Sequence, residues 1–163
     1  MARKSAVLIP TLAAAVLIGG LGIAFMPQDI KERTADFPRG TVRIGDDVIT
    51  VEIAETTAEK QRWMTFRQDR LSLDTAMLIK HATPDLYEVW MLNVEYHLDL
   101  IWFDQDGNAV YVKKDVAPCE NILDQVSCIY KPTSRALYVV AGTAGFADEH
   151  GIEVGSKMTL ISV

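Results

Sequence analysis

The sequence predicts an α+β domain that is rich in β-strands, with a strongly bent sheet or partial barrel and one or two short helices. An N-terminal transmembrane helix is expected to precede it. Three observations support this fold class. An uncharged apolar run extends from Ala6 to Met26. Short segments with alternating or continuous apolar residues follow between Thr41 and Val163, as is typical of strands. A capping box at Thr56 opens a short helix.

The N-terminal run is long enough to cross a bilayer. At about 1.5 Å of helical rise per residue it spans roughly 31 Å, close to the hydrocarbon thickness. Arg3 and Lys4 precede it, so we expect residues 1–5 to stay in the cytoplasm. A cleaved signal segment is the alternative, since small residues near the end of the run are compatible with cleavage.

Residues 6–26 are therefore predicted to be a membrane anchor or signal segment. The mixed charges and prolines of residues 27–40 predict a linker. Residues 41–163 form the predicted single extracytoplasmic domain. The expected location is a bacterial inner membrane with the domain in the periplasm, or secretion to the periplasm if the segment is cleaved.

The charge balance argues against a nucleic-acid partner. The first 26 residues hold two of the 16 Lys and Arg residues and none of the 22 Asp and Glu residues. The remainder thus carries 14 cations against 22 acids, a net charge of −8. Binding to phosphates needs clustered cations, and docking on an anionic lipid surface needs them as well.

The two cysteines, Cys119 and Cys128, both follow the apolar run. In an oxidising compartment the simplest interpretation is a disulfide, which would stabilise the fold by about 2 to 3 kcal/mol through loop closure. A redox or metal role is the alternative. The spacing is longer than that of a redox motif, and no histidine is adjacent in sequence.

The first predicted elements are a hairpin and a helix. Residues 41–44 and 48–53 alternate around Gly45-Asp46-Asp47, and Ile49, Val51 and Ile53 should form the core face of the second strand. Thr56 and Glu59 then form a capping box for a helix to about Thr65. Trp63 and Met64 are its expected anchors.

The remaining elements follow from β-propensity and turn signals. The middle of the chain is expected to form a strand over 76–79, a turn at Thr83-Pro84-Asp85, and strands over 87–92 and 98–103. A hairpin loop over 104–108 then leads into a strand over 109–112, and an irregular segment over 118–132 follows. The last elements are a strand over 135–141, a helix capped by Thr143 and ending at His150 before Gly151, and a strand over 157–163.

Glu95-x-His97-x-Asp99 is the sharpest local cluster of functional groups. Alternation in an extended segment would place these three side chains on one face, where they could bind a metal or act as acid and base. In the alternative interpretation, Glu95 and His97 lie on a solvated turn. Asp99 lies in an apolar run, so it either pins a turn or lines a site. It would need backbone N–H donors or a cation such as Arg67 or Arg135.

Trp90, Met91 and Asn93 combine flat apolar surface with an amide, which suits sugar or peptide binding. Burial of Trp90 and Met91 in the core is the alternative. Nucleotide-binding, serine-hydrolase and zinc-protease motifs are absent from the sequence. We therefore expect no cofactor and no metal.

Two segments resemble the domain-of-unknown-function 192 family: Val89-Trp90-Met91-Leu92-Asn93-Val94 and Leu98-Asp99-Leu100-Ile101. The family pattern is Phe-Trp-Met-Lys-Asn-Thr followed by Pro-Leu-Asp-Ile/Leu, and the resemblance covers about residues 48 to 163. It implies a compact β-rich domain with one or two short helices and no established reaction. The family Lys and Thr are Leu92 and Val94 here, which puts a shared site in doubt. The positions that match are Trp90, Met91, Asn93, Asp99 and Arg67, and these are the predicted binding residues.

Three functions are compatible with the sequence. The first is a non-enzymatic binding or accessory module of the cell envelope, with a glycan, peptide or protein as partner. The second is an enzyme on envelope glycans or peptides, with Asp99 and His97 or Glu95 as acid and base. The third is a structural domain without a small-molecule site.

Overall fold

The computed structural model describes residues 36–119 and 128–163. The predicted cytoplasmic N-terminus, the apolar run 6–26 and most of the predicted linker lie outside the described residues. Within the described ranges no helix is both long and apolar enough to cross a membrane. The membrane anchor therefore stays a prediction from the sequence.

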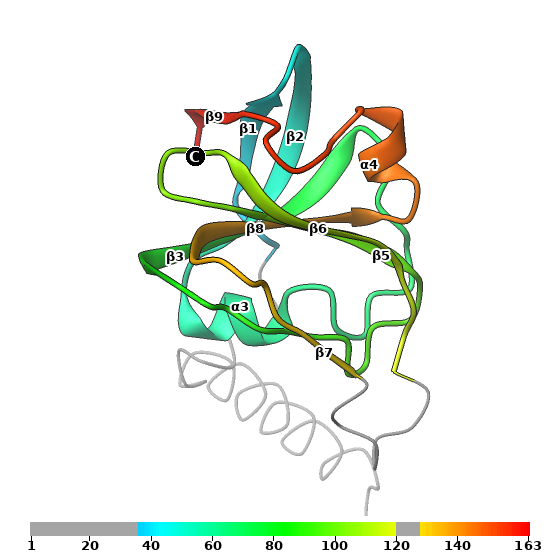
Figure 1. Ribbon diagram of the computed structural model, residues 1–163. Coiled ribbons are helices and arrows are strands. Elements are labelled where there is room, and N and C mark those ends of the chain that lie inside the picture. Colours follow the sequence, from blue (N-terminus) through cyan, green and yellow to red (C-terminus); the bar gives the residue numbers. More distant parts are fainter. Residues whose placement is uncertain (1–35, 120–127) are drawn as a thin grey trace, which may run out of the picture. The chain divides into compact units, whose positions relative to one another are not determined.

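In the described residues, seven strands form one strongly bent, unclosed sheet (Figure 1). Its order is β6 (Ala109–Val116), β5 (Leu98–Phe103), β8 (Ala136–Thr143), β3 (Thr75–Asp85), β2 (Asp47–Ala54), β1 (Arg39–Ile44) and β9 (Met158–Ser162). β2 and β3 pair in parallel, and the other neighbours are antiparallel. β4 (Val89–Trp90) and β7 (Ile129–Tyr130) form a separate pair. The prediction of a β-rich α+β domain with a strongly bent sheet or partial barrel and one or two short helices is confirmed in its first form, a bent sheet that does not close, with two short helices among the described residues.

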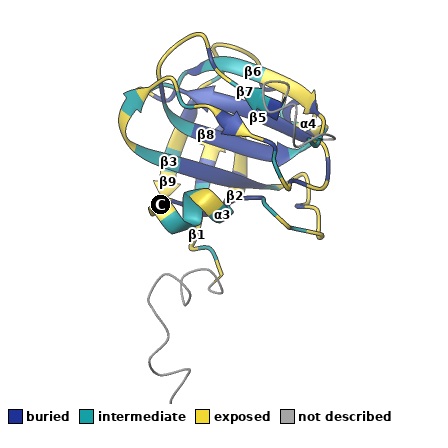
Figure 2. Ribbon diagram, turned by 90° about the horizontal axis from the view of Figure 1, so that it is seen from below, coloured by how far each residue is buried: buried dark blue, intermediate teal, exposed yellow. Residues whose placement is uncertain are grey.

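Two helices lie on opposite sides of the central strands, α3 (Thr57–Arg62) on one side and α4 (Phe146–Glu149) on the other (Figure 1). Each side holds its own apolar cluster. Leu100 and Trp102 of β5 belong to the cluster on the α3 side, whereas Ile101 and Phe103 belong to the cluster on the α4 side. β5 is therefore buried on both faces, as the dark central strands in Figure 2 show.

The two ends of the strand order approach each other at one point. Asn108 and Lys157 form an isolated bridge, and the Met158 N–H donates to the Gly107 carbonyl at 2.7 Å. Gly107 has φ +82°, and a Cβ there would lie 2.2 Å from the Met158 carbonyl oxygen. A glycine is thus required both for the turn and for this close approach.

The predicted hairpin and capping box are confirmed. Ile49, Val51 and Ile53 of β2 are buried. The Thr56 hydroxyl accepts from the Glu59 N–H, and the Glu59 carboxylate accepts from the Thr56 N–H. α3 is shorter than expected, because it ends at Arg62.

One turn prediction and one strand prediction between residues 83 and 92 are wrong. The expected turn at Thr83-Pro84-Asp85 is the end of β3, which passes through an irregularity and then pairs Asp85 with Ala136 of β8. The parallel pairing of β3 with β2 stops at Ile79, so Pro84 interrupts no ladder on that side. The expected strand over 87–92 shrinks to β4.

The predicted cap of the second helix is also wrong. α4 begins after Gly145, which has φ +97° and no side chain to cap with. The Thr143 hydroxyl instead donates to the Leu71 carbonyl at 2.8 Å. The predicted irregular segment contains β7, while the last strand is confirmed as β9.

His150 connects the end of α4 to two other parts of the fold. One ring nitrogen, Nδ1, lies 2.8 Å from the Asp47 carboxylate, and the other, Nε2, lies 2.7 Å from the Leu73 carbonyl. Burial lowers the pKa of this ring, but the hydrogen bonds to Leu73 and Asp47 and the charges of Asp47 and Asp74 raise it more, so the pKa lies above its ordinary value. The protonated ring can donate to both partners at once.

We expect His150→Gln to destabilise the protein more at pH 6 than at pH 8. The pKa of His150 is higher in the folded protein than in the unfolded chain, where it is near 6.5. The stability that protonated His150 contributes is therefore fully present below about pH 6.5 and is lost as the pH rises through the folded pKa. Thermal unfolding of wild type and variant at both pH values measures the difference. An equal loss at the two pH values would contradict it. His97→Gln, at an exposed position, is the control.

Candidate functional site

A pocket of about 370 Å³ opens between α3, the loop after it, β3 and β4. Two of its lining residues are buried and apolar: Ile79 of β3 and Val139 of β8, which are register partners on adjacent strands. Trp63, directly after α3, adds a buried aromatic wall. The other lining residues are Lys60, Gln61, Thr65, Phe66, His81, Glu88, Val89, Trp90, Leu92 and Asn93. Apolar walls with a few polar groups are typical of ligand pockets.

Two large aromatic side chains of this pocket are exposed. Phe66 is 71% exposed and Trp90 is 42% exposed. Phe66 also has φ +56°, a left-handed conformation that is rare for a bulky side chain. Its N–H donates to the Asn93 carbonyl at 2.7 Å, and Asn93 has φ +58°. Two left-handed residues thus connect the loop after α3 to the segment after β4.

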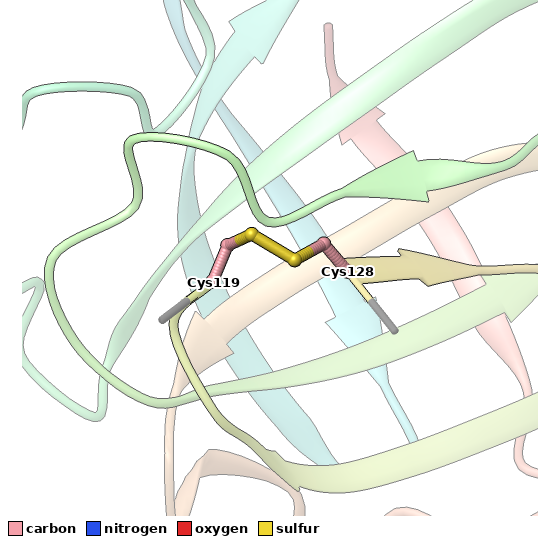
Figure 3. Close-up of a disulfide and its surroundings, with 2 residues drawn as sticks. All are labelled: Cys119 and Cys128. Carbon is pink, nitrogen blue, oxygen red and sulfur yellow. A yellow bond between two sulfur atoms is a disulfide. The ribbon is translucent and has the colours of Figure 1, made fainter. Parts of the chain in front are cut away.

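The disulfide supports the Trp90 side of the pocket. Cys119 and Cys128 are bonded with their Cα atoms 5.3 Å apart, which confirms the predicted bridge (Figure 3). The Cys128 carbonyl accepts from the Met91 N–H at 3.0 Å. The next residue, Ile129, pairs with Trp90 in the two-stranded sheet. The bridge therefore holds the strand that positions Trp90.

His81 is a neutral ring in the pocket wall. It stacks on Tyr87 with ring centroids 3.3 Å apart and planes 5° apart. Burial and the neighbouring charge of Lys60 lower the pKa of His81 to about 4. At pH 7 the ring is therefore uncharged, and it offers a flat surface with one donor and one acceptor nitrogen.

Comparison with known proteins places the chain in a family. The family described as DUF192, Uncharacterized ACR, matches residues 40–160. The chain belongs to the DUF192 family. The resemblance seen in the sequence is thereby confirmed. None of the curated proteins compared with the chain matches it.

Two solved structures share the DUF192 fold seen here. A candidate transcription regulator from Sinorhizobium meliloti matches with a TM-score of 0.68 and 20% identity, over 77% of this chain and 96% of that one. A protein of unknown function from Novosphingobium aromaticivorans matches with a TM-score of 0.65 and 23% identity, over 74% of this chain and 84% of that one. At this identity the likeness shows the fold alone.

The DUF192 motif residues divide between the pocket and the core. Trp90 and Asn93 line the pocket. Met91, which lies between them in the sequence, is fully buried. Asp99 and Arg67 do not line it. The five predicted binding residues are therefore not brought together in one site.

Asp99 is buried at 1% exposure and holds two separate segments in place. One carboxylate oxygen accepts from the Asp115 N–H at 2.8 Å, where the register between β5 and β6 shifts. The other accepts from the N–H groups of Gly145 and Ala147 at 3.0 and 2.9 Å. Asp99 thus supplies the cap that α4 lacks from its own N-terminal residue. Of the two kinds of partner expected for Asp99, backbone N–H donors or a cation such as Arg67 or Arg135, the structure shows the backbone donors.

The Glu95, His97 and Asp99 side chains do not converge. Glu95 and His97 are exposed, and His97 pairs with the Asp115 carboxylate at 2.8 Å. Tyr96 and Leu98 are buried, and the alternating residues Glu95 and His97 are exposed. Asp99 is buried and points to the α4 side of the sheet. Among the described residues no group of three or more His, Cys, Asp or Glu side chains could hold a metal ion.

Arg67 pairs with a buried carboxylate on β2. Its guanidinium donates twice to Glu52, at 2.5 and 3.1 Å, and its Nε donates to the Asp69 carbonyl at 3.2 Å. Hydrogen bonding to Glu52 raises the pKa of Arg67 despite partial burial. Glu52 is buried on the strand face opposite Ile49, Val51 and Ile53, where Arg67 compensates its charge.

Sequence reasoning missed most of the pocket. Phe66 lies in a polar stretch, and Lys60 and His81 belong to elements that are far apart in the chain. The signal available in the sequence was Phe66 itself, an aromatic residue directly before the mostly polar stretch from Arg67 to Asp74.

Proposed function

We propose that this DUF192 protein is a non-enzymatic binding module that captures a ring-bearing ligand, of the kind found in envelope glycans, in the pocket between α3 and β4. Phe66 and Trp90 supply apolar faces on which a ring can stack. The Asn93 and Gln61 amides supply hydrogen-bonding groups beside those faces. Such a combination suits a sugar, which has both apolar faces and hydroxyl groups.

The exposed ring of Phe66 carries the proposal. A left-handed backbone costs a bulky residue about 1 to 2 kcal/mol, and glycine or asparagine would adopt it at less cost. The side chain gains little from burial, because most of it is in solvent. Folding therefore gives no reason for an aromatic ring here, whereas contact with a ligand does.

The predicted anchor over 6–26 adds a location to this proposal. It would tether the module to the outer face of the inner membrane through the linker 27–40, where envelope glycans are within reach. The disulfide is consistent with an oxidising compartment.

The catalytic alternative gains no support from the site geometry. The Asp99 carboxylate is occupied by backbone donors, and His97 lies outside the pocket. We therefore do not propose an acid and base role for these residues.

Trp90→Ala is expected to raise the Kd for a bound saccharide at least about tenfold with little change in stability, because the ring is largely in solvent. Phe66→Asn should weaken binding similarly and leave stability unchanged or raised by about 1 kcal/mol through relief of strain. Calorimetric titration of the full chain in mild detergent, with saccharides first selected on a glycan array, measures the affinity. Thermal unfolding measures the stability.

Ile161→Ala, an exposed apolar position on β9 outside the pocket, is the control and should bind normally. Global unfolding of Trp90→Ala would show that the residue belongs to the core. Unchanged affinity in both pocket variants would contradict the proposed site.

A further inference from the structure

The charges around the pocket are not balanced. Glu88 is the acidic residue among its lining residues, and its carboxylate lies 2.9 Å from the Lys131 ammonium group. Lys60 is half-buried and has no ion pair with any of the residues that the structure describes. The pocket thus holds one compensated carboxylate and one uncompensated cation.

The positive charge of Lys60 acts within the pocket. It contributes, after burial, to the low pKa of the neighbouring His81 ring. Apolar walls strengthen such an interaction, because they lower the effective dielectric constant. The chain outside residues 1–26 has a net charge of −8, so a cationic pocket is an exception on an acidic protein.

The hydrogen-bonding groups of the pocket point to a hydroxylated ligand. The side-chain amides of Gln61 and Asn93 make no hydrogen bond with other described residues, so they are available to a ligand. A purely aromatic acid would leave these amides unused, whereas a sugar would engage them.

We propose that the ligand of this pocket is an acidic saccharide, a sugar ring bearing a carboxylate, and that Lys60 selects it over its neutral counterpart. This inference rests on the proposed function, because it assumes that the pocket binds a ring. The ring stacks on Phe66 and Trp90, its hydroxyl groups meet the amides, and its carboxylate pairs with the Lys60 ammonium group.

A matched pair of sugars tests the selection. N-acetylmuramic acid differs from N-acetylglucosamine by a lactyl group that carries a carboxylate, and benzoate carries a carboxylate without hydroxyl groups. Calorimetric titrations of the full chain should show that N-acetylmuramic acid binds about tenfold or more tightly than N-acetylglucosamine. Benzoate should bind more weakly than the acidic sugar.

Lys60→Met should remove the preference, lowering the affinity for the acidic sugar about tenfold and leaving that for the neutral sugar unchanged. Lys113→Met, which removes the same charge at an exposed site on β6 outside the pocket, should keep the preference. A wild-type titration at two salt concentrations gives a second measurement that needs no variant. The affinity for the acidic sugar should fall as salt rises, and that for the neutral sugar should not.

The outcomes separate the two proposals. Equal binding of both sugars, or a preference that survives Lys60→Met, would overturn selection by Lys60 and leave the binding module standing. Tight binding of benzoate would overturn the saccharide class. No binding of any of the three probes, together with an empty glycan array, would overturn the proposed function itself.

Discussion

Asp99→Ala is expected to lower the free energy of unfolding by about 4 kcal/mol, because three N–H groups lose their acceptor, one in a buried and two in part-buried hydrogen bonds. An unsatisfied buried group costs about 1 to 3 kcal/mol. The affected groups belong to Asp115, Gly145 and Ala147. A loss of this size is a large fraction of the stability of a domain. Chemical denaturation of wild type and variant measures the loss, provided that the dependence of the unfolding free energy on denaturant concentration (the m-value) is the same for both.

Two further variants separate the role of the carboxylate from that of the position. Asp99→Asn keeps one acceptor oxygen but turns an amide NH₂ toward backbone donors, so it should retain part of the stability. Glu95→Ala, at a nearby exposed acid, should change the stability by less than about 0.5 kcal/mol. A loss below about 1 kcal/mol for Asp99→Ala would show that the three hydrogen bonds do not hold α4 and the β5–β6 irregularity in place.

The role of Asp99 changes how the DUF192 motif is understood in this chain. The apolar run around it is buried on both faces, so its position in a central strand follows from the packing of two clusters. The carboxylate is needed where a helix of four residues begins at a glycine. In this chain the Leu98-Asp99-Leu100-Ile101 segment therefore supports the fold, and Trp90 and Asn93 are the part of the motif that reaches the pocket.

The features that the sequence predicted well are those encoded by neighbours in the chain. The Thr56 capping box, the hairpin around Gly45 and the strand over 98–103 each follow from residues a few positions apart. The extension of β3 to Asp85 was not predictable in this way, because it depends on pairing with Ala136 of β8, which is distant in sequence. Local turn chemistry at Pro84 was overridden by this tertiary pairing.

The site shows the same division. Trp90 and Asn93 were predicted because an aromatic ring and an amide lie close together in one segment. Phe66 and Lys60 come from the α3 region and His81 from β3, so their convergence depends on the arrangement of the sheet. No pattern within any one segment reports it.

Arg67→Met is expected to lower the free energy of unfolding by about 3 kcal/mol, because it leaves the Glu52 carboxylate buried without its main partner. The Glu52 side chain is 8% exposed and the Arg67 side chain is 26% exposed. Arg39 lies 3.7 Å from the same carboxylate, but it is largely in solvent and can replace little of the lost interaction. Denaturant unfolding of the single variant measures this loss.

The double variant Glu52→Met, Arg67→Met tests why the single change is costly. Replacing both charges with apolar side chains removes the desolvation penalty together with the attraction, so the double variant should be more stable than Arg67→Met and within about 1 kcal/mol of wild type. A double variant that loses as much stability as the sum of its single changes would contradict a coupled pair.

Arg67→Lys should be more stable than Arg67→Met but less stable than wild type. A lysine keeps the charge, but it cannot form both the paired contact to Glu52 and the contact that the Arg67 Nε makes with the Asp69 carbonyl.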